Sequence, residues 1–213
     1  VGGKTAVNTD YGKNLVGAFY QPDEVFINPE FLKTLDDKQF KSGLGEVIKY
    51  GFIERSCFGE YNLLGYLSEN SQNILNRDEK ILSRLIEICI NLKKSVVERD
   101  EKEKDLRRIL NFGHTLAHAI EKITDYKKHT HGEAVVEGMK FAFDAANRKG
   151  LIDENYKFFA LDLIQKFGFK DLPKYDMQKL SDLMKSDKKA NANSIVFVLP
   201  TDYAAVQAFE IAD

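Results

Sequence analysis

Cysteine is scarce in this sequence, and no apolar run is long enough to cross a bilayer. The 213 residues include two cysteines, Cys57 and Cys89, which form no metal-binding or redox motif. The uncharged apolar run near the end, SIVFVLP, is far shorter than the roughly 20 residues that a transmembrane helix needs. No signal-peptide pattern opens the chain. We therefore expect a protein of the reducing cytoplasm with no membrane partner.

An excess of charge of either sign is also missing. The 31 lysines and arginines are offset by 33 aspartates and glutamates, which gives a formal net charge of -2. Charges of both signs are interspersed, and this argues against a nucleic-acid partner while leaving room for local basic pockets. With 43% hydrophobic residues, the chain can bury the core of one large domain or two small ones.

The chain starts with Val1 rather than Met, and VGGKTAVN has the composition of a loop already under way. We expect it to be part of a longer protein. Residues 1–22 are rich in glycine, which predicts a structured loop, and EVFIN at residues 24–28 predicts a short strand that ends at Pro29.

Helical periodicity dominates the rest of the sequence. It predicts helices at residues 37–54, 58–68, 78–99, 109–124, 132–149, 153–168 and 176–186. Near the end, NSIVFVLP and YAAVQAFEI are two β-prone runs separated by a short turn, which predicts a hairpin. The expected fold is mainly α, a multi-helix domain over residues 23–213 with a short strand near its start and a C-terminal β-hairpin.

A polar stripe accompanies the apolar residues of LRRILNFGHTLAHAIE. Arg107, Asn111, His114 and His118 follow one another at steps of four, three and four, so they share one face if a single helix begins at or before Arg107. Such a stripe is usually a solvated face, but a solvated face typically carries Lys and Glu. Arg, Asn and two histidines between apolar neighbours suit a cleft better, although histidines hydrogen-bonded within a core would also fit.

All four histidines fall within a short stretch of the chain, because His129 and His131 follow in HTHGEAV. With no thiolate nearby, a zinc site here would combine histidine and carboxylate, a donor set that leaves a position open for substrate or water. His131 is the stronger candidate, and His129 is expected to be an ordinary loop residue. Glu46 could supply the carboxylate, or could simply form an exposed ion pair with Lys49.

Lys93 interrupts an apolar stripe. It stands seven residues after Ile86 and three before Val96, so it lies on the inward face of its predicted helix. An ammonium in that position needs a partner, and the phosphate or carboxylate of a ligand would serve. The alternative is that the side chain reaches out to solvent.

Several segments resemble one known family when they are taken together and in order. These are VGGKTAVN, GKNLVGAFYQP, GLGEVIKYG, RRILNFGHTLAHAIE, HGEAV and MKSDKK, which closely resemble 3-dehydroquinate synthase over almost the whole chain. The resemblance implies a lyase that depends on NAD and on Zn²⁺ or another divalent cation such as Co²⁺. Its reaction converts 3-deoxy-D-arabino-heptulosonate 7-phosphate into 3-dehydroquinate and phosphate, a step of the shikimate pathway to chorismate and the aromatic amino acids.

The family is also expected to have an N-terminal nucleotide-binding α/β domain and a mainly helical C-terminal domain, commonly in a homodimer. This chain resembles the helical domain, preceded at residues 1–22 by the glycine-rich loop from the cofactor cleft. By itself it is expected to bind metal without turnover.

The resemblance assigns roles to individual residues. It implies metal ligands at Glu46, His114 and His131. This replaces the simpler interpretation in which His114 and His118 are two ligands of one metal ion. It implies catalytic roles for Lys49, Lys93, Glu103 and His118. Substrate contacts are implied at Lys4, Asn14, Arg107, Asn111 and Lys188, with Lys189 an alternative to the last. Contacts with NAD are implied at Lys4, Lys13, Phe31, Leu32, Lys33 and Thr34.

Two related activities remain as alternatives. Another sugar-phosphate cyclase would use the same metal and NAD on a different sugar phosphate. A metal-dependent polyol dehydrogenase would accumulate NADH and would have little need for Arg107 and Lys188.

Overall fold

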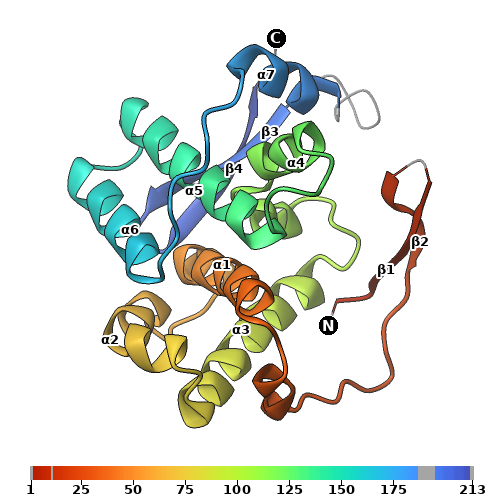
Figure 1. Cartoon of the computed structure of the whole chain (residues 1–213), viewed down its shortest axis with the longest axis vertical. Helices are drawn as coiled ribbons and strands as arrows, with labels where there is room; N and C mark the ends of the chain where they lie inside the picture. The colour runs from red at the N-terminus through yellow and green to blue at the C-terminus, as the bar shows by residue number, and fades with distance from the viewer. Residues whose placement is uncertain (1, 11, 187–194, 212–213) are drawn as a thin grey trace.

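The computed structural model describes residues 2–10, 12–186 and 195–211. It contains a helical body with a hairpin of strands at each end of the chain (Figure 1). The α-helices are α1 (Asp37–Ile53), α2 (Leu63–Leu75), α3 (Glu79–Arg99), α4 (His114–Ile123), α5 (His131–Arg148), α6 (Glu154–Lys166) and α7 (Met177–Ser186). The strands are β1 (Lys4–Thr9), β2 (Gly12–Phe19), β3 (Ile195–Asp202) and β4 (Ala205–Ile211), and the 3₁₀ helices are η1 (Pro29–Lys33), η2 (Arg55–Cys57) and η3 (Leu106–Asn111).

Helix α5 lies at the centre of the body, where it packs against α1, α4, α6 and β3 (Figure 1). Three fully buried rings meet there edge to face: Phe52 of α1, Phe143 of α5 and Phe112, which precedes α4. Their centroids are 4.8 Å apart for Phe52 and Phe143 and 5.8 Å apart for Phe112 and Phe143. Aromatic pairs favour this arrangement. The core therefore ties together the three helices on which the metal-binding candidates lie.

The mainly helical fold and the C-terminal hairpin are confirmed. Strands β3 and β4 pair antiparallel, and Val198, Leu199 and Val206 are buried. Five of the seven predicted helices lie within two residues of their expected bounds. Within the described ranges, no helix combines the length and apolarity that crossing a bilayer requires.

The strands near the N-terminus are not where the sequence predicted them. Residues 4–9 and 12–19, expected to be a loop, form the β1–β2 hairpin. Gly17 allows it, because a Cβ there would lie 2.1 Å from Thr5 O on the paired strand. Residues 24–28 form no strand, since this apolar run has no neighbouring strand to pair with and Phe26 is 90% exposed.

Two predicted helices also differ from the structure. The helix expected at residues 58–68 begins at Leu63, because Phe58 and Asn62 have φ values of +60° and +54°, which a right-handed helix cannot contain. The helix expected at residues 109–124 is divided into η3 and α4. Gly113, with φ +78°, separates them.

Candidate metal and substrate site

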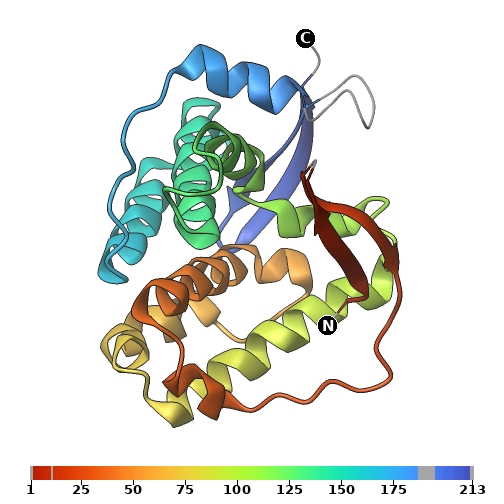
Figure 2. The same cartoon turned by 45° about the vertical axis from the view of Figure 1, so that its right-hand side comes forward.

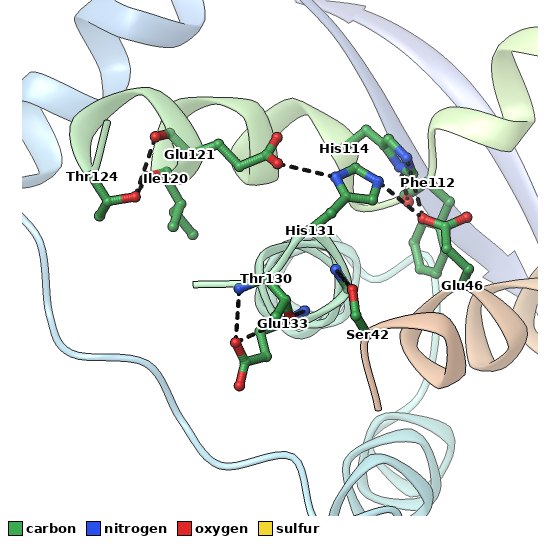
Figure 3. A network of polar contacts seen from close by, with 11 residues as sticks. Ser42, Glu46, Phe112, His114, Ile120, Glu121, Thr124, Thr130, His131 and Glu133 are labelled. Carbon is green, nitrogen blue, oxygen red and sulfur yellow. Dashed lines mark hydrogen bonds and ion pairs between the residues drawn. The ribbon is translucent and has the colours of Figure 1, made fainter. Parts of the chain in front are cut away.

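Three side chains from three helices converge on one point. Glu46 comes from the middle of α1, while His114 and His131 are the first residues of α4 and α5. Oε1 of Glu46 lies 3.5 Å from Nε2 of His114 and 3.3 Å from Nε2 of His131 (Figure 3). One donor atom of each residue lies within 4.8 Å of the other two. We call these three residues the metal corner.

The metal corner fits a divalent cation. In a tetrahedral zinc site with bonds of about 2.0–2.2 Å, neighbouring donors lie about 3.3–3.6 Å apart, as the two measured distances do. Oε1 of Glu46 is buried and accepts no well-aligned hydrogen bond within the described part of the chain. A carboxylate with two imidazoles is a donor set that zinc accepts, with a coordination position left open. These residues can therefore hold a metal ion.

Close contacts between helices bring the three residues together. A Cβ on Gly132 would lie 1.9 Å from Ser42 O, and the Gly132 amide donates to Ser42 Oγ at 3.0 Å. The start of α5 is thereby pressed against α1, one turn before Glu46. Farther along α5, a Cβ on Gly138 would lie 1.9 Å from Gly113 O, so α4 begins directly against the same helix. The absence of side chains at Gly132 and Gly138 sets the spacing of the donors.

Each imidazole is oriented through its other ring nitrogen. Nδ1 of His114 lies 3.0 Å from Phe112 O, a carbonyl that can only accept, so Nδ1 carries the proton. Nδ1 of His131 lies 3.3 Å from Oε1 of Glu121, a buried carboxylate of α4 (Figure 3). In both rings Nε2 is left to face Glu46, as a metal ligand requires.

The charges of the corner are set by its surroundings. Burial would raise the pKa of Glu46, but contacts with His131, Lys49 and His114 outweigh burial and hold the pKa well below its usual range. Burial, followed by the charge of Lys49, lowers the pKa of His114 to about 3. The carboxylates of Glu121 and Glu46 raise the pKa of His131 to about 9. Without a metal, His131 therefore carries the positive charge that a bound cation would replace.

Beside the metal corner lie Lys4, Lys49, Lys93 and Arg107, which we call the cation cluster. Lys49 is 3% exposed and donates to Oε2 of Glu46 at 2.6 Å. Burial and then the charges of Lys49 and Arg107 lower the pKa of Lys93. Burial and then the charges of Arg107 and Lys93 lower the pKa of Lys4. Like charges held this close favour an anionic ligand.

Part of the cluster is engaged by the chain itself. Arg107 is 2% exposed, and its guanidinium donates to Glu101 O at 2.6 Å and to Gly2 O at 2.7 Å. Lys4 forms an ion pair with Glu103, whose Oε1 also accepts from Nδ2 of Asn111 at 3.0 Å. These bonds tie the N-terminal segment to η3, and Figure 2 shows the β1–β2 hairpin alongside that part of the body.

Comparison with known proteins identifies the family. Residues 43–190 match 3-dehydroquinate synthase C-terminal, and residues 1–42 match 3-dehydroquinate synthase N-terminal. The chain belongs to the 3-dehydroquinate synthase family. The 3-dehydroquinate synthase of Alkaliphilus metalliredigens is 43% identical over 97% of this chain and 57% of its own length. That of Dictyoglomus thermophilum is 43% identical over 99% of this chain and 58% of its own length. The chain thus spans less than two thirds of these relatives.

Solved structures share the fold of this family member. A 2-deoxy-scyllo-inosose synthase complexed with carbaglucose-6-phosphate, NAD⁺ and Co²⁺ matches with a TM-score of 0.81 and 30% identity, over 99% of this chain and 59% of that one. The 2-epi-5-epi-valiolone synthase of Streptomyces hygroscopicus subsp. jinggangensis, solved with NAD⁺ and Zn²⁺, matches with a TM-score of 0.83 over 100% of this chain and 58% of that one. At 23% identity, the second match shows the fold alone.

The polar stripe seen in the sequence is not the face of one helix. Arg107 and Asn111 lie on η3, whereas His114 and His118 lie on α4 beyond Gly113. The expectation of a single helix face is therefore wrong, because the left-handed glycine redirects the chain between the two pairs. His118 is exposed one turn along α4, with its ring centroid 5.6 Å from that of His114. His129 contacts Tyr175, with 2.5 Å between its Nε2 and the hydroxyl oxygen.

The residues that the family resemblance assigns to NAD lie on two separate segments. Lys4 and Lys13 belong to the β1–β2 hairpin, and residues 31–34 belong to η1 and its end, across the extended stretch that Figure 1 shows between them. Phe31 is 75% exposed, and Lys33 pairs with Glu79 at 2.9 Å. Leu32 packs against the core, and Thr34 Oγ1 donates to Phe31 O at 3.1 Å. Of residues 31–34, Phe31, Lys33 and Thr34 are exposed and Leu32 is half-buried.

Of the two remaining expected substrate contacts, Asn14 lies within the described ranges and Lys188 does not. Asn14 is exposed on β2, where its amide donates to Asn8 Oδ1 at 3.1 Å. Lys188 and its alternative Lys189 lie outside the described residues. Sequence reasoning missed Glu121, although it stands seven residues after His114 and so on the same face of α4. That spacing was the available signal.

Proposed function

We propose that this chain is the metal- and substrate-binding part of a 3-dehydroquinate synthase. The enzyme would convert 3-deoxy-D-arabino-heptulosonate 7-phosphate into 3-dehydroquinate and phosphate. The observation that carries the proposal is the metal corner, in which Nε2 of His114 and Nε2 of His131 lie 3.5 and 3.3 Å from Oε1 of Glu46, directly beside the cation cluster. The name and sequence of the relatives from Alkaliphilus and Dictyoglomus support it.

In this proposal Glu46, His114 and His131 hold Zn²⁺ or Co²⁺. The donor chemistry and spacing support the assignment, and so does the Co²⁺ bound in the similar 2-deoxy-scyllo-inosose synthase structure. When bound, the metal supplies Lewis-acid polarisation of a substrate hydroxyl and NAD supplies a reversible hydride acceptor. Lys49 donates to the second oxygen of Glu46, Oε2, which leaves Oε1 for the metal.

The other assigned residues bind and orient a substrate that carries a carboxylate, a phosphate and several hydroxyls. Lys4, Lys93 and Arg107 neutralise its negative charge, with the planar guanidinium suited to a bidentate contact. Asn111 and Glu103, already bonded to each other, orient hydroxyls. His118 is exposed beside His114, where it can hold or move a proton at the departing phosphate.

Asn14 and Lys188 complete the proposed phosphate contacts. For NAD, we propose contacts from Lys4, Lys13 and residues 31–34, with the remainder of the site in the part of the relatives that this chain does not span. Exposed apolar residues such as Val7, Val16 and Phe26 suit further burial in a complete enzyme, which we propose is a homodimer. A cytoplasmic setting agrees with the free thiols of Cys57 and Cys89.

The test compares this chain alone with the same chain joined to the part of the Alkaliphilus metalliredigens relative that it does not cover. We expect the chain alone to bind zinc and to release no phosphate from 3-deoxy-D-arabino-heptulosonate 7-phosphate in the presence of NAD. The joined protein should release phosphate and form 3-dehydroquinate without net NADH. Turnover by the chain alone would contradict the division of roles between the two parts.

The same assay separates the alternatives. The similarity to 2-deoxy-scyllo-inosose synthase makes another cyclase the second candidate function. Phosphate release from glucose 6-phosphate, whose carba analogue is bound in that structure, and not from the heptulosonate phosphate would favour it. Net accumulation of NADH with a polyol would instead favour a dehydrogenase.

A further inference from the structure

We propose that Glu121 is a positioning residue that orients His131 so that its Nε2 faces the metal. The inference rests on the metal centre of the proposed function. Glu121 touches neither the metal nor the substrate in this proposal, and it acts through the imidazole of His131.

The first support is geometric. Oε1 of Glu121 lies 3.3 Å from Nδ1 of His131, and Nε2 of the same ring lies 3.3 Å from Oε1 of Glu46 (Figure 3). The ring is thus held between two carboxylates, one from α4 and one from α1. Because Nδ1 and Nε2 point in different directions, a ring bonded to Glu121 through Nδ1 presents Nε2 to the metal corner.

The second support is the different exposure of the two ligand rings. The His114 side chain is 14% exposed and is held by a backbone carbonyl, whereas the His131 side chain is 43% exposed. An exposed side chain keeps more rotamer freedom, and that freedom is lost when it binds a metal. A fixed acceptor at Nδ1 restricts the ring before the metal binds and so reduces this loss. Glu121 therefore matters for His131, whereas His114 is already held by a backbone carbonyl.

The third support is the burial of Glu121 itself. The residue is 6% exposed, and Leu116, Ala117 and Ile120 of the same helix are also buried. A carboxylate withdrawn from water is destabilising unless it is hydrogen-bonded or paired with a cation. His131 is such a partner, because its Nδ1 lies 3.3 Å from Oε1 of Glu121.

Glu133 offers a matched control. It lies on α5, two residues after His131, but its carboxylate accepts from the amide of Thr130 at 2.9 Å and turns away from the ring (Figure 3). Glu133→Gln therefore removes one negative charge near His131 without removing a contact to the ring. Glutamine also preserves the capping box that begins α5.

The experiment measures the zinc dissociation constant of the whole chain by competition with a chromophoric chelator. Glu121→Ala should weaken zinc binding by about 10- to 100-fold, the usual range for partners of ligand histidines. Glu121→Gln, which keeps an oxygen able to accept from Nδ1, should lose less, and Glu133→Gln should stay within about twofold of the unmodified chain. In a His131→Ala background, adding Glu121→Ala should cause no further loss.

Circular dichroism melts of the metal-free variants identify any that fail to fold. If Glu121→Ala does not fold, Glu121→Gln, whose side chain has nearly the same volume, provides the test instead. Unchanged zinc affinity in the folded Glu121 variants would overturn the inference, as would an equal loss with and without His131. If His114→Ala loses zinc while the Glu121 variants keep it, the metal centre stands and only the inference falls. An unmodified chain that binds no zinc would overturn both.

Discussion

The metal corner and the cation cluster are neighbours, but they are built in different ways. The metal corner belongs entirely to the helical body, where Gly132 and Gly138 fix the spacing of α1, α4 and α5. In the cation cluster, Lys49, Lys93 and Arg107 belong to that body, whereas Lys4 is on the β1–β2 hairpin. The geometry of the first region follows from core packing, and the geometry of the second also depends on where the hairpin lies.

The two regions also differ in whether their polar groups are already bonded by other groups of the chain. In the metal corner, Oε1 of Glu46 remains open to a cation. In the cation cluster, Arg107 is already bonded to Gly2 O and Glu101 O, and Lys4 is paired with Glu103. An anion that binds there must share these cations with the chain or displace its groups. Metal affinity should therefore be a property of the helical body alone, while anion affinity should change with the attachment of the hairpin.

The largest expected effect is a loss of bound metal, and it should distinguish two histidines of α4. Removing one of the three proposed protein ligands should weaken zinc binding by more than the roughly 100-fold upper range for residues that only orient a ligand, so His114→Ala should lose its metal on dialysis. His118→Ala should keep the metal, because its side chain is not one of the three converging donors, and it should lose turnover in the joined enzyme. Metal analysis by atomic absorption checks this. Two fully loaded variants would contradict the assignment of His114.

The second expected effect is a loss of stability when the bonds that attach the hairpin are removed. Arg107→Ala leaves the carbonyls of Gly2 and Glu101 without their donor, which should lower the free energy of unfolding by about 1–3 kcal/mol and speed amide exchange in residues 4–9. Zinc affinity should not change. Arg108→Ala is the control, because Arg108 is partly exposed and pairs with Glu210 at 3.3 Å, which predicts a change within about 1 kcal/mol. A zinc loss in Arg107→Ala comparable to that of His114→Ala would show that the regions are not independent.

A third effect concerns the pH dependence of the metal-free chain. The pKa of His131 is raised from 6.5 to about 9, chiefly by Glu121 and Glu46, so the folded state binds a proton more tightly than the unfolded state. The resulting stability is fully present below about pH 6.5 and is lost as the pH rises through about 9. Urea unfolding after chelator treatment measures it, as the difference between the chain and His131→Gln across this window. Equal pH dependence in both proteins would exclude His131 as the source.

The helices were predictable from the sequence because apolar residues at helical spacing must face the core. The division at Gly113 was not, since a left-handed residue leaves the apolar spacing on either side intact. The same holds for Phe58 and Asn62, whose positive φ values delay the start of α2. The β1–β2 hairpin escaped prediction because glycines that suggest a loop, such as Gly17, here allow close pairing of strands.

The candidate site was predictable in a different way. Spacing along the chain placed His114 beside His118, and residue chemistry made His131 and Glu46 candidate ligands. Only the resemblance to the family selected these two together with His114 as one ligand set. Convergence of residues far apart in sequence depends on how helices pack, which local periodicity does not encode. Glu121 shows the converse case: its spacing from His114 was visible, but its contact with His131 depends on α5 lying against α4.

The smallest expected effect is an absence of change, and it tests whether the metal corner is preformed. Cys57 is fully buried, and burial raises the pKa values of Cys57 and Cys89 to about 12, even though the charge of Lys49 acts in the opposite direction. At pH 9 about one thiol in a thousand would be ionised, so neither should react with a thiol reagent in the folded chain. The same protection should persist after the metal is removed, because core packing rather than the cation holds Lys49 and Glu46 in place. Urea should expose both thiols to full reaction. If chelation alone makes them reactive, the cation is needed to assemble the corner, and the contrast with the cation cluster disappears.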